Sequence, residues 1–128
     1  MEEARQAQQA YEDHTKKINQ ANAMLGSKNA QNRIKGIQTI VSVAGADSVS
    51  ALVVLMQTDP NFDVRIAATT ALGALGPAAK AALPNINGML RQPPYEPPIN
   101  ANAEQLDAQM KDGDYRRALR DALAKISH

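Results

Sequence analysis

The chain has 128 residues, with 14 lysines and arginines against 13 aspartates and glutamates, and it lacks cysteine and tryptophan. This length supports one domain of ordinary size, and a formal net charge of +1 gives no general attraction for nucleic acid or an anionic membrane. Without cysteine, disulfides, thiolate metal clusters and a cysteine nucleophile are excluded. Because 23 residues are alanine and only four are aromatic, closely packed helices are favoured over a β-sandwich.

No apolar run approaches the roughly 18–20 residues that a membrane-spanning helix needs, so we predict no membrane insertion by this segment. The acidic start Met1-Glu2-Glu3, with no apolar stretch after it, is unlike a signal peptide. The sequence leaves the compartment open, because both the cytoplasm and the periplasm are compatible with this composition.

Residues 1–26 are predicted to form one polar helix, because glutamine, alanine, glutamate and lysine dominate and no proline or glycine precedes Gly26. The less polar positions recur at alternating spacings of three and four, which makes a narrow heptad stripe. This stripe favours docking on the rest of the domain, since a seam so poor in large apolar residues holds a free pair of helices badly. A homodimer through this helix is the alternative. The stripe consists of Ala4, Ala7, Tyr11, His14, Ile18, Ala21 and Leu25.

Three segments of the chain align without gaps when one arginine in each is superposed. Each begins with Asn or Asp, residue types that cap helix N-termini, four places before that arginine, and apolar residues recur at matching offsets. We therefore predict three equivalent helices, each the second member of a helix pair. The segments are 29–43 with Arg33, 61–75 with Arg65 and 112–126 with Arg116.

The helices between these segments supply the first members of pairs. Asp47 is predicted to cap one of them, which ends at Thr58-Asp59-Pro60. Pro77 suits the first turn of the next one. Pro84 lies further along the same helix and is predicted to kink it, because proline lacks the backbone N–H donor.

The last helix pair contains an insertion at residues 92–110. It opens with four prolines in six residues, which favours a stiff, extended path. The end of the insertion, from Ala103 to Met110, is predicted to regain a short helix. We divide the chain into the polar N-terminal helix at 1–26 and a helical repeat domain at 27–128 that contains this Pro-rich insertion.

The central part of the chain resembles a known family. Asp59-Pro60-Asn61-Phe62-Asp63-Val64-Arg65, followed by Ala71-Leu72-Gly73-Ala74-Leu75-Gly76-Pro77, is similar to a HEAT repeat of the short variety found in phycobilisome-lyase-like proteins. The resemblance is specific over about residues 46–91 and weaker over 28–45 and 112–126. It implies an all-α fold, a short right-handed α-solenoid of three helix pairs preceded by the polar helix. The second helices would line a concave side, which often holds partners.

The resemblance also implies a structural role for the repeat arginines. In the family, this arginine commonly meets an acidic residue of a neighbouring repeat. Carried over, the role falls to Arg65 and Arg116, with Asp63 and Asp114 as acceptors. The first repeat has Gln31 in the place of the acid, so no such pair is assigned to its arginine.

Residue types that carry catalysis or bind metals are scarce. His14 lies in the helical stripe and His128 is the last residue, so no metal site is predicted. Neighbouring acids at helix starts are more often caps than catalytic pairs, and no glycine-rich phosphate loop is present. The one dense basic group lacks interleaved aromatics on which bases could stack. We therefore predict no enzyme activity, no cofactor and no nucleic-acid binding.

The predicted partner-binding site comes from columns of equivalent positions on the three second helices. Ile37 and Ile66 stand in columns where a solvated helix usually shows charge, and an exposed apolar strip of this kind tends to be covered. A partner protein and the N-terminal helix are both open as the covering element. A neighbouring column holds Gln38, Thr70 and Asp121. The predicted site consists of Ile37, Ile66, Thr69 and Thr70, edged by Arg117 and Arg120.

These observations favour a non-catalytic protein–protein interaction or scaffolding module that binds another protein through the concave helical face. The alternative is an accessory subunit of a bilin-lyase-like enzyme, which rests on the resemblance alone. In the insertion, Pro94-Tyr95-Glu96-Pro97 fits the spacing that proline-reading domains recognise. A rigid loop that covers the end of the stack is the stronger interpretation of that segment.

Overall fold

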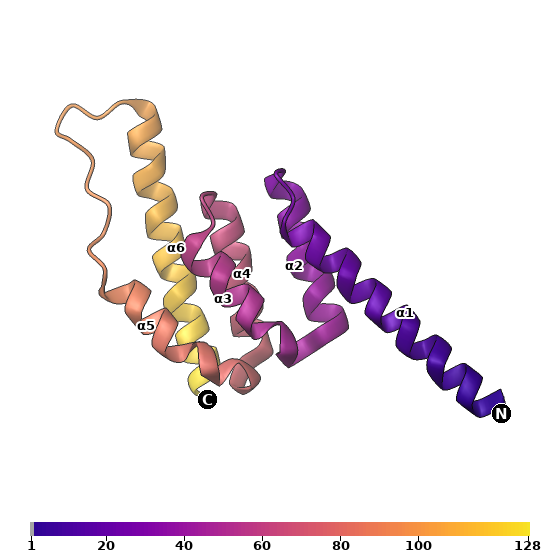
Figure 1. The fold of residues 1–128 in the computed structure, drawn as a ribbon. Coiled ribbons are helices and arrows are strands. Elements are labelled where there is room, and N and C mark those ends of the chain that lie inside the picture. The colour runs from indigo at the N-terminus through magenta and orange to yellow at the C-terminus, as the bar shows by residue number, and fades with distance from the viewer. Residues whose placement is uncertain (1) are drawn as a thin grey trace.

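The computed structural model describes residues 2–128, and every regular element within them is a helix. The helices pair and the pairs stack side by side, as Figure 1 shows. This arrangement is the all-α solenoid that the sequence predicts. Its elements are α1 (Glu2–Leu25), α2 (Ala30–Ala44), the 3-10 helix η1 (Gly45–Ser48), α3 (Val49–Thr58), α4 (Phe62–Leu75), the 3-10 helix η2 (Gly76–Ala82), α5 (Leu83–Arg91) and α6 (Ala103–Ser127).

Helix α1 packs against α2 only through its C-terminal part. Ala21 is fully buried there, and Ile18 and Leu25 are half-buried. Gly36 of α2 permits the close approach, because a Cβ atom at this position would lie 2.9 Å from the backbone nitrogen of Leu25. Helices α1 and α2 thus form the first pair, so the polar helix belongs to one of the three pairs and does not precede them, while the division of the chain at residue 26 stays a prediction.

Asparagines cap the N-termini of α2 and α4, as the repeat alignment predicts. Asn29 Oδ1 accepts a backbone N–H at 2.8 Å and Asn61 Oδ1 accepts one at 3.2 Å. Both helices end at a glycine with positive φ, which is 54° at Gly45 and 60° at Gly76. Glycine adopts this conformation without steric strain. Asparagine caps therefore fix the N-terminal ends of these two helices, and glycine backbone conformation fixes their C-terminal ends.

The last repeat departs from the pattern, because Asp112 is not an N-cap. Helix α6 begins well before it, where Asn102 and Gln105 form a reciprocal capping box with hydrogen bonds of 2.8 and 2.9 Å. Good helix formers follow this cap, so the helix runs through Asp112 without a break. The short helix predicted at 103–110 is the first part of α6. Residues 92–102 form an irregular, proline-rich loop that stands above the stack in Figure 1.

The second and third pairs begin with 3-10 turns. Asp47 lies inside η1 and does not cap α3, whose N-cap is Ser48. The predicted cap is wrong because the chain is already helical from Gly45 onward. Pro77 stands in the first turn of η2 and Pro84 in the first turn of α5, where the missing N–H donor leaves no helical hydrogen bond unmade. The kink predicted at Pro84 coincides with the junction of η2 and α5.

Two stretches, Ala30–Thr58 and Phe62–Arg91, match a membrane-spanning helix by length and composition alone. Each is divided at one of the positive-φ glycines, Gly45 or Gly76. The α2 and α4 segments have 15 and 14 residues, fewer than the roughly 20 that span a bilayer. The match is therefore weak, and the absence of membrane insertion stays a prediction.

Candidate partner-binding site

An apolar groove runs between α2 and α4, the second helices of the first two pairs. Its volume is about 360 Å³. Side chains three or four positions apart share one helix face, so α2 contributes a wall of branched residues and α4 a wall of small ones. Polar side chains are few among the lining residues, which are Ile34, Ile37, Gln38 and Val41 of α2 and Ala67, Thr70, Ala71 and Ala74 of α4.

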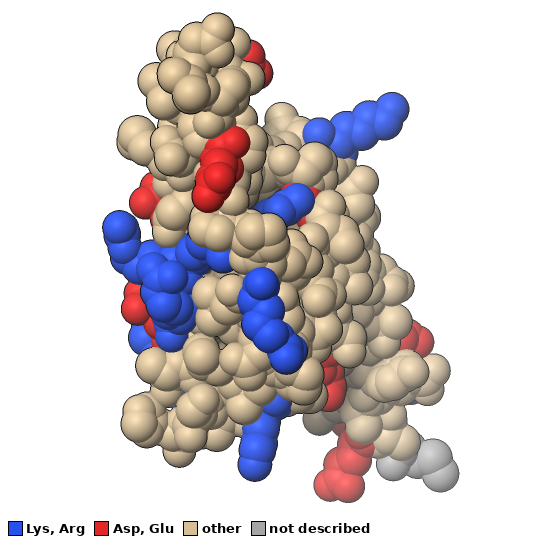
Figure 2. Space-filling view, turned by 90° about the vertical axis from the view of Figure 1, so that its left-hand side faces the viewer, with Lys and Arg blue, Asp and Glu red and all other residues tan. Residues whose placement is uncertain are grey.

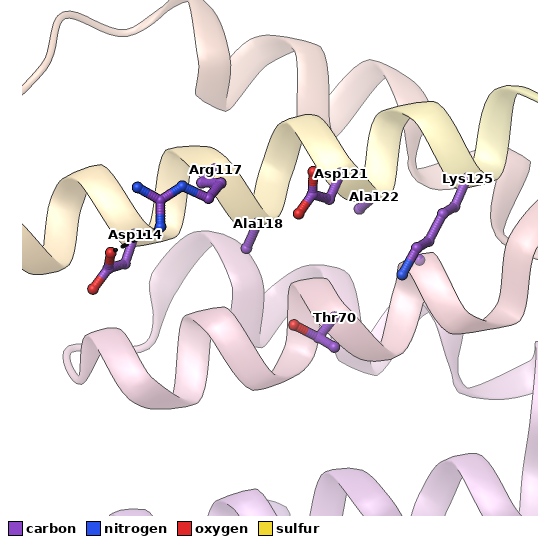
Figure 3. A pocket seen from close by; sticks show the side chains of 8 residues that line it. Thr70, Asp114, Arg117, Ala118, Asp121, Ala122 and Lys125 are labelled. Atoms are coloured by element: carbon purple, nitrogen blue, oxygen red, sulfur yellow. Dashed lines mark ion pairs between the residues drawn. The ribbon is translucent and has the colours of Figure 1, made fainter.

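A second groove, of about 190 Å³, lies between α4 and α6. The charged side chains along its α6 wall alternate in sign, as Figure 3 shows. Asp114 Oδ1 and Arg117 Nη1 form an ion pair of 3.6 Å, and both side chains are exposed, so solvent weakens their attraction. The charged residues of this groove are Asp114, Arg117, Asp121 and Lys125.

The two grooves join across α4, because Thr70 lines both of them. Small residues let α4 pack closely against its neighbours: a Cβ atom at Gly73 would lie 3.2 Å from the Cα atom of Ala122 on α6. The result is one continuous surface over α2, α4 and α6, which we call the second-helix face and define by the residues that line the two grooves. Helix α1 contributes no residue to either groove, so the N-terminal helix does not cover this face.

Comparison with known protein families matches residues 21–107 to HEAT repeats. The match begins in α1, ends in α6 and covers about two-thirds of the chain. The chain belongs to the HEAT-repeat family. No curated protein and no solved structure matches it. Stacked helix pairs of this kind present extended surfaces that commonly serve as protein-interaction scaffolds. The finer resemblance to the phycobilisome-lyase-like variety stays a prediction.

The second-helix face of this HEAT-repeat chain contains three of the six predicted site residues. Ile37 and Thr70 line the apolar groove, and Arg117 lines the charged one. Ile66 is half-buried and Arg120 is exposed, and neither is among the residues that line the two grooves. The role of these residues in binding a partner stays a prediction.

The exposure predicted for Ile37 and Thr69 is wrong, because both side chains are buried. The Thr69 hydroxyl donates a hydrogen bond of 2.7 Å to the Arg65 carbonyl and is satisfied within its own helix. The close approach of α4 to α6 at Gly73 covers the side of α4 that a helix standing alone would expose. Ile37 lines the apolar groove from the α2 wall but is only 2% exposed.

Sequence reasoning missed the alanines of the α4 wall, at positions 67, 71 and 74. Ala74 is exposed and the other two are half-buried. The available signal was their spacing of four and three, which is that of one helix face.

Arg33 makes the most buried ion pair between neighbouring repeats among the described residues. Its Nε lies 2.8 Å from Oδ2 of Asp59 and its Nη2 lies 3.1 Å from Oδ1, with the two side chains 13% and 3% exposed. Arg33 also donates to the Ser27 carbonyl, and Asp59 accepts the Asn61 N–H. The one repeat arginine to which the HEAT resemblance assigned no partner is therefore fully paired, because its acceptor comes from the turn between α3 and α4.

Arg65 does not pair with Asp63, which the family resemblance implied as its acceptor. Residues two apart on a helix point in different directions. The Arg65 Nε instead donates to the Asp59 carbonyl. Its guanidinium lies 5.4 Å from the ring centroid of Phe62 and 5.8 Å from that of Tyr115, in the geometry of a cation–π contact. Arg65 thus joins the second repeat to the third without an ion pair.

Arg116 pairs with Asp112 rather than with Asp114. Its Nε lies 3.0 Å from Asp112 Oδ2, one helical turn earlier, because Asp112 belongs to α6. Arg116 also donates to the Pro93 carbonyl at 2.7 Å, and Asp112 accepts the Tyr95 N–H at 3.1 Å. The pair therefore ties the start of the proline-rich loop to α6.

Tyr115 connects the third repeat to the second. Its side chain is buried, and its hydroxyl donates a hydrogen bond of 2.6 Å to the Met56 carbonyl. Burial raises the pKa of Tyr115 from 10.0 to about 12, against a lowering effect of the positive charges of Arg65 and Arg116.

We expect Tyr115 to make the fold sensitive to alkali. Because its pKa is higher in the folded than in the unfolded chain, its contribution to stability is fully present below about pH 10 and is lost as the pH rises through about 12. Tyr115→Phe should flatten this decline, and loss of the hydrogen bond should cost about 1 kcal/mol at pH 7. Urea unfolding of both proteins between pH 7 and pH 12 measures this; equally steep alkaline declines would contradict it.

Acidic and basic side chains are interspersed on the surface of the stack. Figure 2 views the end formed by α5 and α6 and shows acidic side chains among the basic ones. Among residues 2–128, no three His, Asp or Glu side chains come together in a group that could hold a metal ion. The second-helix face thus offers an apolar groove for hydrophobic contact and a charged groove for ion pairing.

Proposed function

We propose that this HEAT-repeat chain is a non-catalytic binding or scaffolding module that holds an amphipathic helix of a partner protein on its second-helix face. The proposal rests on the apolar groove between α2 and α4, which is open to solvent and lined almost entirely by apolar side chains. Removing such a surface from water is favourable, and a groove of this kind often marks an interaction site.

The shape of the groove suits a helix. Its α2 wall extends from Ile34 to Val41, about two helical turns or 10 Å. Apolar side chains spaced i, i+3 or i+4, and i+7 on a partner helix cover the same length. The side chains of Ala71 and Ala74 on the opposite wall are small and project little into the groove, so the backbone of a partner helix can approach α4 closely.

The charged groove beside it supplies orientation. Asp114, Arg117, Asp121 and Lys125 alternate in sign along α6, and charges at the edge of an interface contribute more to specificity than to affinity. A partner helix with the opposite order of charges along one edge pairs with all four charges of this row in one direction only. The proposed partner is therefore amphipathic, with mixed charges beside its apolar face.

We expect the double variant Thr70→Asp with Ala74→Asp to lose at least about tenfold in partner binding, since a desolvated carboxylate opposes burial of the groove. Both positions are exposed, so the fold should survive, with only a small cost from two like charges one turn apart. Affinity capture from native host extract, quantified by mass spectrometry, measures the loss.

The matched control is Val54→Asp, which places the same charge on α3 at a side chain that is 57% exposed and lies in neither groove. It should leave capture unchanged. Circular dichroism melts of all three proteins verify that folding is intact. If the double variant is folded and still captures the same proteins as the parent chain, the second-helix face is not the binding site.

A further inference from the structure

The N-terminal two-thirds of α1 lies outside the stack. Every residue from Glu2 to Lys17 is exposed, and burial begins only at Ile18. In Figure 1 this part of the helix extends away from the other pairs. The exposed residues include Tyr11, whose side chain is 71% exposed. A helix segment of this length is marginally stable alone in water, so the fold leaves it without the packing that usually holds a helix.

The exposed segment continues a stripe that is already used for packing. Ile18, Ala21 and Leu25 pack against α2, and positions seven apart lie on nearly the same side of a helix. The members Ala4, Ala7, Tyr11 and His14 therefore continue on the same side, beyond the packed part. Helix α2 packs against the last three of the seven stripe positions, and the first four are exposed, with no described residue packed over them.

We propose that two copies of the chain pair through this segment, with the α1 helices antiparallel and centred near Gln9. In this register Ala7 lies opposite Tyr11 of the second copy, and Ala4 lies opposite His14. Each layer then combines one small and one large side chain, which fills the interface evenly. A parallel pair would set Tyr11 against Tyr11 and Ala7 against Ala7, which crowds one layer and leaves a gap in the other.

Charge complementarity favours the same register. Glu3 and Lys17 flank the stripe on one side, at equivalent positions of two different heptads. Neither takes part in the ion pairs formed within residues 2–128. Antiparallel pairing brings Glu3 of each copy beside Lys17 of the other, which gives two symmetric ion pairs at the flank of the seam. In a parallel pair these two charges stay far apart.

Charge reversal tests the pairing on the full chain. Sedimentation equilibrium should show a concentration-dependent dimer for the natural sequence. Glu3→Lys and Lys17→Glu should each weaken the dimer on the order of tenfold, because two attractive contacts become repulsive. The double variant should recover the homodimer, and an equimolar mixture of the two single variants should form a heterodimer. Recovery of the homodimer by the double variant would show that these charges act between the two chains, and not only through the effect of Glu3 on its own helix dipole.

Cross-linking tests the direction of the helices, since the chain has no cysteine of its own. Ala10→Cys lies beside the two-fold axis at the edge of the seam and should be joined to itself by a short bis-maleimide. Gln9→Cys, on the outer side, is the matched control and should not react across the dimer. Efficient linkage of Ala4→Cys without linkage of Ala10→Cys would show parallel pairing, and a strictly monomeric parent chain would end the proposal outright. Because α1 lines neither groove, these results do not depend on the proposed function.

Discussion

Replacement of Asp59 by asparagine should lower the free energy of unfolding by about 3 kcal/mol, because it removes one partner of a buried ion pair. Asp59 receives two hydrogen bonds from Arg33 and one from the Asn61 backbone, and its side chain is almost inaccessible. The variant keeps the size of the side chain but leaves the guanidinium of Arg33 without its counter-charge. Urea unfolding at neutral pH measures the loss.

The chain provides a matched control in the ion pair of Lys111 with Asp107. Its nitrogen and oxygen lie 3.6 Å apart and both side chains are exposed, so Asp107→Asn should change stability by no more than about 0.5 kcal/mol. If Asp59→Asn costs as little as this control, Arg33 and Asp59 do not hold the first repeat to the second in the way the geometry indicates.

Replacement of Leu72 by alanine should cost about 3–4 kcal/mol, through lost burial and the cavity left behind. Leu72 is fully buried in α4, the helix that supplies a wall to both grooves. Stability in a solenoid depends on contacts between neighbouring repeats, so a defect in the middle helix weakens contacts on both sides. Denaturant unfolding, followed by circular dichroism, measures the change.

Leu106→Ala is the matched control for this prediction. Leu106 lies near the start of α6 and its side chain is 49% exposed, so the same truncation leaves no enclosed cavity. Its effect should stay below about 1 kcal/mol, as for a surface substitution. Similar losses at both positions would contradict the central role of α4.

Features of the fold that depend on local chemistry were predictable from the sequence. Asn29 and Asn61 cap their helices where the repeat alignment places them, because an N-cap needs only its own side chain and the next few backbone groups. Asp112 failed the same rule because Asn102 and Gln105 had already started the helix. A favourable cap earlier in the chain therefore overrides a repeat pattern that matches in sequence.

The candidate site was predictable only in part, because burial depends on the distance between helices. The repeat alignment places Gln38, Thr70 and Asp121 in one column, and all three line one or both of the two grooves. Periodicity gives the direction of a side chain around its own helix but not how closely the next helix approaches. At Gly73 the two helices come close enough to bury Thr69.

The ion-pair partner of Arg33 could not be predicted from the sequence either. Asp59 is 26 residues away in the chain, in the turn that joins α3 to α4. No acidic residue stands at the position that the repeat pattern assigns to the acceptor, which is occupied by Gln31. The stacking of repeats brings the two side chains together, so the pair is a consequence of the fold and is not encoded in either repeat alone.

Site-directed photo-cross-linking shows directly whether the second-helix face holds a partner helix. A photoreactive phenylalanine analogue at Thr70 should become joined to a partner segment with apolar residues spaced i, i+3 or i+4, and i+7, whereas the same group at Val54 should not. Peptide mass spectrometry of the cross-linked product identifies the segment. Linkage of the partner to Val54, or to the loop at 92–102, with none at Thr70 would show that the partner binds away from the second-helix face.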